Sequence, residues 1–162
     1  MQGLVYLETT VFSPYYEERT SPDILARKEW TRRWWDKCRT EYTLVTSTAV
    51  FDELDRGTYP HKEPARTMAG MVPILPVTHE IADIITVYTK HHLMPADPAG
   101  DALHLALASY HKCDYLLTWN CQHLANANKF GHLQKINAML GLFVPILTTP
   151  LGLLGEYGDE TK

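Results

Sequence analysis

Short apolar segments alternate with longer segments of helical periodicity along this chain, and this alternation restricts the fold more than any other feature. The short apolar or β-branched segments are residues 4–7, 42–46, 74–77, 115–119 and 143–147. Each has the length and composition of a buried strand. Strands separated by helices form a parallel sheet with helices on both faces, because crossover connections are right-handed. We therefore predict an α/β protein with three layers, α/β/α, around a central parallel sheet.

Capping and proline signals mark the starts of several helices between these strands. Ser21 precedes Pro22, and Asp97 precedes Pro98, a combination that favours the first turn of a helix. Ser47 or Thr48 can cap a further helix. The predicted helices cover residues 24–39, a segment after Ser47 that Gly57 ends, and residues 64–71, 79–91, 98–110 and 129–140.

Composition limits the class of protein. A chain of 162 residues with 45% hydrophobic content can bury one core, so we expect one domain over residues 1–154 and a frayed tail over 155–162. We expect neither export nor membrane spanning, because no signal sequence or long apolar run is visible, and a cytoplasmic protein follows. The net charge of −4 argues against a protein that coats nucleic acid non-specifically.

Four polar residues are expected at one edge of the sheet. Glu8 follows the first strand and Asn120 follows the strand over 115–119, and carboxyl ends of parallel strands share an edge. Glu53 and Asp101 join them if their helices present their N-terminal halves to that edge. Clustered carboxylates repel one another unless some of them are protonated or a cation neutralises them, and a divalent metal is the natural solution. Oxygen ligands suit Mg²⁺ or Mn²⁺, which would activate water for phosphodiester hydrolysis.

The order of these motifs resembles a known family. The segments VYLETT, VFDELDRG, GDALHLALA and YLLTWNCQHL are similar, in that order, to those of PIN-domain nucleases, especially the VapC-type toxins of bacterial toxin–antitoxin pairs. The segments PVTHE and TTPLGLL add to the likeness, which covers nearly the whole chain. The resemblance implies an α/β/α fold and an Mg²⁺- or Mn²⁺-dependent endoribonuclease that leaves a 5′-phosphate. It also implies an antitoxin partner and a homodimer.

Position by position, the resemblance assigns the first, second and third family acids to Glu8, Glu53 and Asp101, and a supporting hydroxyl to Thr10. Two positions depart from the family pattern. Glu8 stands where the family usually has Asp, which moves the carboxylate outward by roughly 1 Å. Asn120 or His123 stands where the fourth acid is expected, so an amide or imidazole replaces a charge.

Other interpretations of these residues stay open at this point. Asp101 also suits the first turn of a helix, where it interacts favourably with the macrodipole. His104 and His111 share a helix face with Asp101, a spacing that zinc sites use. The helix over 24–39 interleaves tryptophans with arginines and lysines, which suits either RNA stacking or burial of an amphipathic face.

The leading hypothesis is a ribonuclease in which Glu8, Glu53 and Asp101 hold Mg²⁺ or Mn²⁺ and Asn120 or His123 positions metal or water. The rival is a catalytically weak PIN-like module that binds RNA or a protein without cutting. The replacements at Glu8 and Asn120 motivate this rival.

Overall fold

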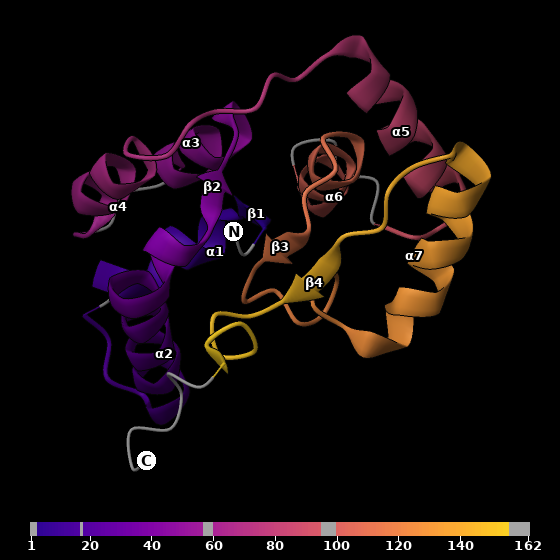
Figure 1. Ribbon diagram of the computed structural model, residues 1–162. Coiled ribbons are helices and arrows are strands. Elements are labelled where there is room, and N and C mark those ends of the chain that lie inside the picture. The colour runs from indigo at the N-terminus through magenta and orange to yellow at the C-terminus, as the bar shows by residue number, and fades with distance from the viewer. Residues whose placement is uncertain (1–2, 17, 57–59, 95–99, 156–162) are drawn as a thin grey trace.

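A four-stranded parallel sheet forms the centre of the molecule, as a computed structural model shows for residues 3–16, 18–56, 60–94 and 100–155 (Figure 1). The strands are β1 (Leu4–Leu7), β2 (Thr43–Val45), β3 (Tyr115–Leu117) and β4 (Ile146–Thr148). Their order is β2-β1-β3-β4, and all neighbouring pairs are parallel. The predicted α/β class and parallel sheet are thus confirmed.

Helices cover both faces of this sheet. One side carries α5 (His79–Lys90), α6 (Asp101–Tyr110) and α7 (Ala127–Leu140), and the other carries α1 (Thr9–Phe12), α2 (Pro22–Cys38), α3 (Thr48–Asp55) and α4 (Lys62–Ala69) (Figure 1). Side chains of β1 alternate between two buried clusters: Tyr6 packs with α5 and α6, whereas Val5 and Leu7 pack with α2 and α3. Three layers, α/β/α, result.

The prediction of a strand over residues 74–77 is wrong, because this segment forms only one isolated bridge. Only Ile74 pairs, through an isolated bridge to Thr46. Leu75 donates its backbone N–H to Thr46 O at 2.8 Å, and the chain then leaves the sheet. Pro73 and Pro76 flank this bridge and have no N–H group, so a longer ladder could not form.

Other boundaries differ by a few residues for local reasons. β4 begins at Ile146 instead of residue 143, because Pro145 cannot donate to the ladder. Ser47 occupies the N-cap position of α3, but its side chain makes no capping bond. The expected starts and stops at Asp97, Pro98 and Gly57 lie outside the described residues; within them, α6 begins at Asp101 after Gly100.

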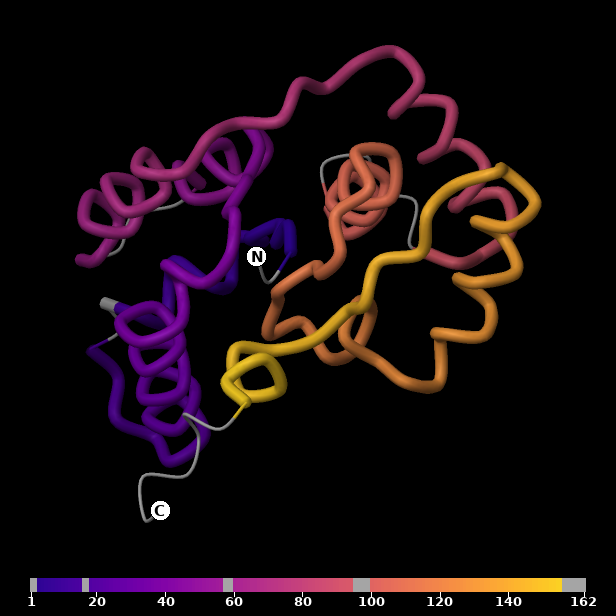
Figure 2. Tube along the Cα trace, viewed as in Figure 1, coloured from indigo at the N-terminus to yellow at the C-terminus, as the bar shows by residue number. Residues whose placement is uncertain are grey.

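The strand order reverses between β1 and β3, and the Cα trace shows the chain leaving β1 toward one edge of the sheet and later returning to build the other (Figure 2). In open parallel sheets, ligands bind beyond the carboxyl ends of the strands at such a reversal. Glu8 follows β1 and Thr118 follows β3 at this point. Among the described residues, no helix is long and apolar enough to cross a bilayer.

Candidate metal centre

Glu8 lies at the reversal of strand order and is nearly inaccessible, with 3% of its surface exposed. Its backbone N–H continues the ladder by donating to Leu117 O at 3.1 Å. Its side chain caps the short helix α1: Oε2 accepts from the Thr10 N–H at 3.1 Å and from the Thr10 hydroxyl at 2.9 Å. Thr118 Oγ1 donates to the same oxygen at 2.9 Å. The strand end thus delivers a carboxylate held by three donors.

The pKa of Glu8 is raised above its ordinary value. Burial is the main cause, because the charged form loses hydration. The positive charge of His104 and the hydrogen bonds from Thr10 and Thr118 act in the opposite direction. Neighbouring donors and positive charge thus offset part of the cost of burying the charged form of Glu8.

Glu53 approaches the same place from the last turns of α3. Its Oε2 accepts a hydrogen bond from Thr9 Oγ1 at 2.9 Å, and its Oε1 lies 2.5 Å from Nε2 of His104. About a fifth of the side chain is exposed, at 20%, so Glu53 connects the buried Glu8 with solvent. The two carboxylates come from elements that are distant in the sequence, the end of β1 and the last turn of α3.

His104 is the group that joins the two acids, and it is buried with 1% exposure. Its Nδ1 lies 2.7 Å from the hydroxyl of Tyr6, which lies 2.7 Å from Ser47 Oγ. Nε2–H donates to Glu53 in either protonation state of the ring. When Nδ1 also carries a proton, it donates to Tyr6 and Tyr6 donates to Ser47; when it does not, Tyr6 donates to Nδ1 and Ser47 donates to Tyr6. The Ser47 hydroxyl is bonded to Tyr6 in both cases and does not cap α3.

The pKa of His104 is raised, although its burial acts to lower it. Burial has the largest single influence, but the hydrogen bond to Glu53 and the charges of the surrounding carboxylates together outweigh it. Burial likewise raises the pKa of Tyr6 well above its usual value, so the phenol stays neutral. The neighbouring carboxylates therefore favour the protonated ring of His104, and burial favours the neutral phenol of Tyr6.

A carboxylate oxygen of Glu8, a carboxylate oxygen of Glu53 and a ring nitrogen of His104 all lie within 4.8 Å of one another. Among the described residues, these are the only histidines, cysteines and acids that form such a group. The spacing fits a small divalent cation once His104 loses its proton, because the neutral imidazole then offers a lone pair in place of a positive charge. In the protonated form, the ring itself supplies the charge that the carboxylates require.

Asp101 lies beside this group and not within it. It is the first residue of α6, one helical turn before His104 on the same face. Its Oδ1 accepts from Asn120 Nδ2 at 2.9 Å. Asn120 Oδ1 in turn accepts from the backbone N–H groups of Gln122 and His123, at 3.2 and 3.0 Å. The expected third and fourth acid positions thus form a neighbouring pair that shapes the loop after β3.

The other residues named from the sequence have separate places. His111 bonds to Pro76 O at 3.0 Å and does not join His104, so the paired-histidine spacing does not produce a zinc site among the described residues. His123 lines a cavity on the far side of its loop. His104 was visible in the sequence only through its spacing of three from Asp101, and nothing there distinguished it from His111.

The tryptophan-rich helix α2 chiefly packs against the core. Trp34 and Trp35 are 0% and 5% exposed and belong to the cluster that contains Val5 and Leu7. Arginine side chains of the helix cover the aromatic surfaces: Arg39 lies 4.9 Å from the ring centroid of Trp35, and Arg33 lies 5.0 Å from that of Trp30. The amphipathic interpretation is confirmed for the two buried tryptophans.

No match was found for this chain among protein-family models, curated proteins or solved structures.

Proposed function

We propose that the chain is a divalent-metal-dependent nuclease that hydrolyses RNA phosphodiester bonds. The observation that carries the proposal is the convergence of Glu8, Glu53 and His104 within 4.8 Å at the reversal of strand order. Buried carboxylates at this place in a parallel sheet are costly unless a proton, a positive side chain or a bound cation neutralises them, and a divalent cation can neutralise both at once. The motif resemblance supports RNA as substrate and a 5′-phosphate as product.

Glu8 and Glu53 supply the anionic ligands, and His104 is the third group able to contact the cation. Carboxylates suit Mg²⁺ and Mn²⁺ alike, whereas an imidazole ligand favours Mn²⁺. A bound divalent cation would supply charge neutralisation for the phosphate and activation of water. Thr10 and Thr118 keep Glu8 oriented, and Thr9 orients Glu53.

A cleft beside Glu53 offers the substrate a path to the centre. It has a volume of about 560 Å³, and its lining includes Thr9, Glu53, Arg19 and His61. Arg19 supplies a positive charge beside Glu18 and Glu53 in the lining of this cleft, which suits contact with a phosphate. We infer that the scissile strand enters along this cleft while Asp101 and Asn120 border the opposite side.

The decisive experiment is cleavage of a structured RNA pool and of a matched DNA pool by purified protein with Mn²⁺, with Mg²⁺ and with chelator. The wild-type protein and the Glu53→Gln and Asp101→Ala variants are compared. His132→Gln serves as a control, because His132 is exposed on α7 and far from the centre in the sequence. We expect metal-dependent RNA cleavage by wild type and control, and loss of at least about a hundredfold in Glu53→Gln.

If neither the wild-type protein nor the control cuts RNA with either metal, the nuclease proposal is overturned in favour of a binding module. Cleavage that persists in chelator, or in Glu53→Gln at the wild-type rate, would place the chemistry elsewhere. The antitoxin partner and the homodimer are likewise proposals from the resemblance. Light scattering of the purified chain tests the dimer directly.

A further inference from the structure

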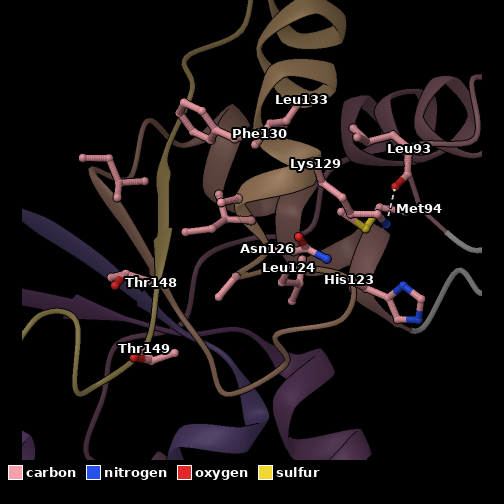
Figure 3. A pocket seen from close by; sticks show the side chains of 14 residues that line it. Leu93, Met94, His123, Leu124, Asn126, Lys129, Phe130, Leu133, Thr148 and Thr149 are labelled. Carbon is pink, nitrogen blue, oxygen red and sulfur yellow. Dashed lines mark hydrogen bonds between the residues drawn. The ribbon is translucent and has the colours of Figure 1, made fainter.

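A second cavity lies on the other side of the loop that follows β3. Its volume is about 470 Å³, within the range of about 300–1,000 Å³ that small-molecule sites occupy. Figure 3 shows Thr148 and Thr149 on one side, Leu93 and Met94 on the other, and residues of α7 between them. The cavity is thus built from three segments that are distant in the sequence.

The walls of this cavity are mainly apolar, and its rim is polar. Met94, Leu124 and Leu133 are buried in the walls, whereas Phe130 and Ile146 also line the cavity and are 36% and 52% exposed to solvent. A flat ligand with apolar faces and polar edges matches such a site. An aromatic residue and a methionine in the lining provide surfaces on which a planar ring can pack.

Positive charge gathers at one end of the cavity. Lys129 lines it and donates from Nζ to Leu93 O at 2.9 Å, which uses one of the three ammonium protons (Figure 3). Asn126 caps the fourteen-residue helix α7, whose first turn also borders the space, by accepting from the Asn128 N–H at 3.0 Å. The ammonium and the positive end of the helix both favour an anionic substituent on the ligand.

Two short chains of hydrogen-bonded residues connect the lining of the cavity with the candidate metal centre. Thr118, whose hydroxyl holds Glu8, donates its backbone N–H to Thr148 O at 2.9 Å, and Thr148 lines the cavity. On the other side, Asn120 contacts Asp101 and accepts the N–H of His123, which lines the cavity. Two strand spacings, or about 10 Å, separate the strand that ends at Glu8 from β4.

We propose that this cavity binds one unstacked base of the RNA strand, with the attached phosphate near Lys129 and the first turn of α7. The proposal rests on the proposed function, since it makes the cavity a subsite for the strand cut at the metal centre. A nucleotide combines the three properties that the cavity selects: a planar ring, polar edges and a negative charge. Single-stranded RNA is recognised in this way by proteins that take a base out of the stack.

Amide chemical shifts of the labelled protein test this proposal in chelator, so that no catalysis is required. The probes are uridine and adenosine 5′-monophosphates, ribose 5-phosphate and inorganic phosphate at millimolar concentration. We expect the nucleotides to shift amides of Phe130, Thr148 and Asn126 far more than ribose 5-phosphate does. Equal shifts with all four probes would reduce the site to a phosphate contact and overturn the base-binding proposal, as would the absence of shifts at these residues.

A substitution that fills the cavity provides the matched comparison. Ala127 lines the cavity and is exposed, so Ala127→Trp should occupy the space without disturbing the core. Met139→Trp adds the same side chain to the far end of the same helix, where Met139 is 59% exposed, and serves as the control. We expect at least about a tenfold loss of nucleotide affinity in the first variant and none in the second. Unchanged affinity in Ala127→Trp would overturn the proposal.

Failure of this inference is distinguishable from failure of the proposed function. If the wild-type protein cuts RNA but nucleotides do not shift the amides of the cavity residues, the nuclease proposal is supported and the subsite proposal is wrong. If nucleotides bind in the cavity but the protein cuts no RNA, the proposal of nucleotide binding is supported and the proposal of RNA hydrolysis is wrong. When both hold, Ala127→Trp should raise KM for RNA and leave the cleavage of an abasic oligonucleotide, which has no planar ring, at the wild-type rate.

Discussion

Nε2 of His104 lies 2.5 Å from Oε1 of Glu53, so an imidazole completes the acidic centre and binds one of its two carboxylates. The same ring contacts Tyr6 through Nδ1. The His104 ring can act in two ways. With its extra proton it balances the charge of the acids, and without that proton it offers a nitrogen lone pair to a cation. Protonation and metal binding should therefore compete.

Metal binding should release a proton from His104. Calorimetric titration of Mn²⁺ into the protein near neutral pH, in buffers with different ionisation enthalpies, should show heats that depend on the buffer for wild type. His104→Gln should bind Mn²⁺ with little dependence on the buffer. Equal buffer dependence in the two proteins would show that the released proton comes from another group.

Stability in chelator should fall as the pH rises above about 6.5. The pKa of folded His104 lies above its ordinary value of 6.5, so the folded state holds the proton more tightly than the unfolded state. The stabilisation is complete below 6.5 and is lost as the pH passes through the folded pKa. Burial of Glu8 raises its pKa and adds a loss in the same direction, beginning above 4.5.

Thermal unfolding at pH 6 to 9 measures this slope. His104→Gln should flatten it, whereas His132→Gln, an exposed histidine, should leave it close to wild type. A slope in His104→Gln as steep as in wild type would contradict the assignment. Adding Mn²⁺ should reverse the trend, and ligand at about a hundred times its dissociation constant should stabilise the fold by about 2.7 kcal/mol.

Removing a hydroxyl donor from Glu8 should destabilise the protein more at neutral than at acidic pH. Thr118→Val keeps the shape of the side chain but deletes two hydrogen bonds of Oγ1, the one it donates to Glu8 Oε2 at 2.9 Å and the one it accepts from Asn120 N–H at 2.9 Å. The expected cost at pH 7 is about 1–3 kcal/mol, since a hydrogen bond to a charged group is lost and the Asn120 N–H loses its acceptor. Denaturant unfolding at pH 7 and pH 4 checks this. An equal loss at both pH values would indicate that Thr118 stabilises the fold through packing and its bond to Asn120, and not through the charge of Glu8.

Tyr6→Phe should test the chain of contacts behind His104. The variant removes the hydroxyl that lies 2.7 Å from both His104 Nδ1 and Ser47 Oγ. We expect a loss of stability of about 1–3 kcal/mol. A double-mutant cycle with Ser47→Ala should give a coupling energy of about 0.5–3 kcal/mol. Additive effects would show that the two hydroxyls do not share a hydrogen bond.

Local patterns in the chain were sufficient to predict much of the architecture. Short apolar segments at residues 4–7 and 115–119 indicated buried parallel strands, and the rule for strand ends placed Glu8 at the carboxyl edge of the sheet. The segment at 74–77 had the same composition, yet it forms only one bridge. Its composition indicated a strand, but the prolines at 73 and 76 remove the donors that a ladder needs.

The amino-acid sequence by itself thus determined the class of fold and the edge at which Glu8 would lie, because both depend on periodicity and chain order. Only the tertiary structure decided which groups meet Glu8. The rotation of α6 about its axis directs His104 toward Glu53 while Asp101, one turn earlier, contacts Asn120. That rotation is set by packing of Leu105, Ala106 and Leu107 into the core, since α6 is apolar nearly all round and its sequence periodicity leaves its buried side undefined.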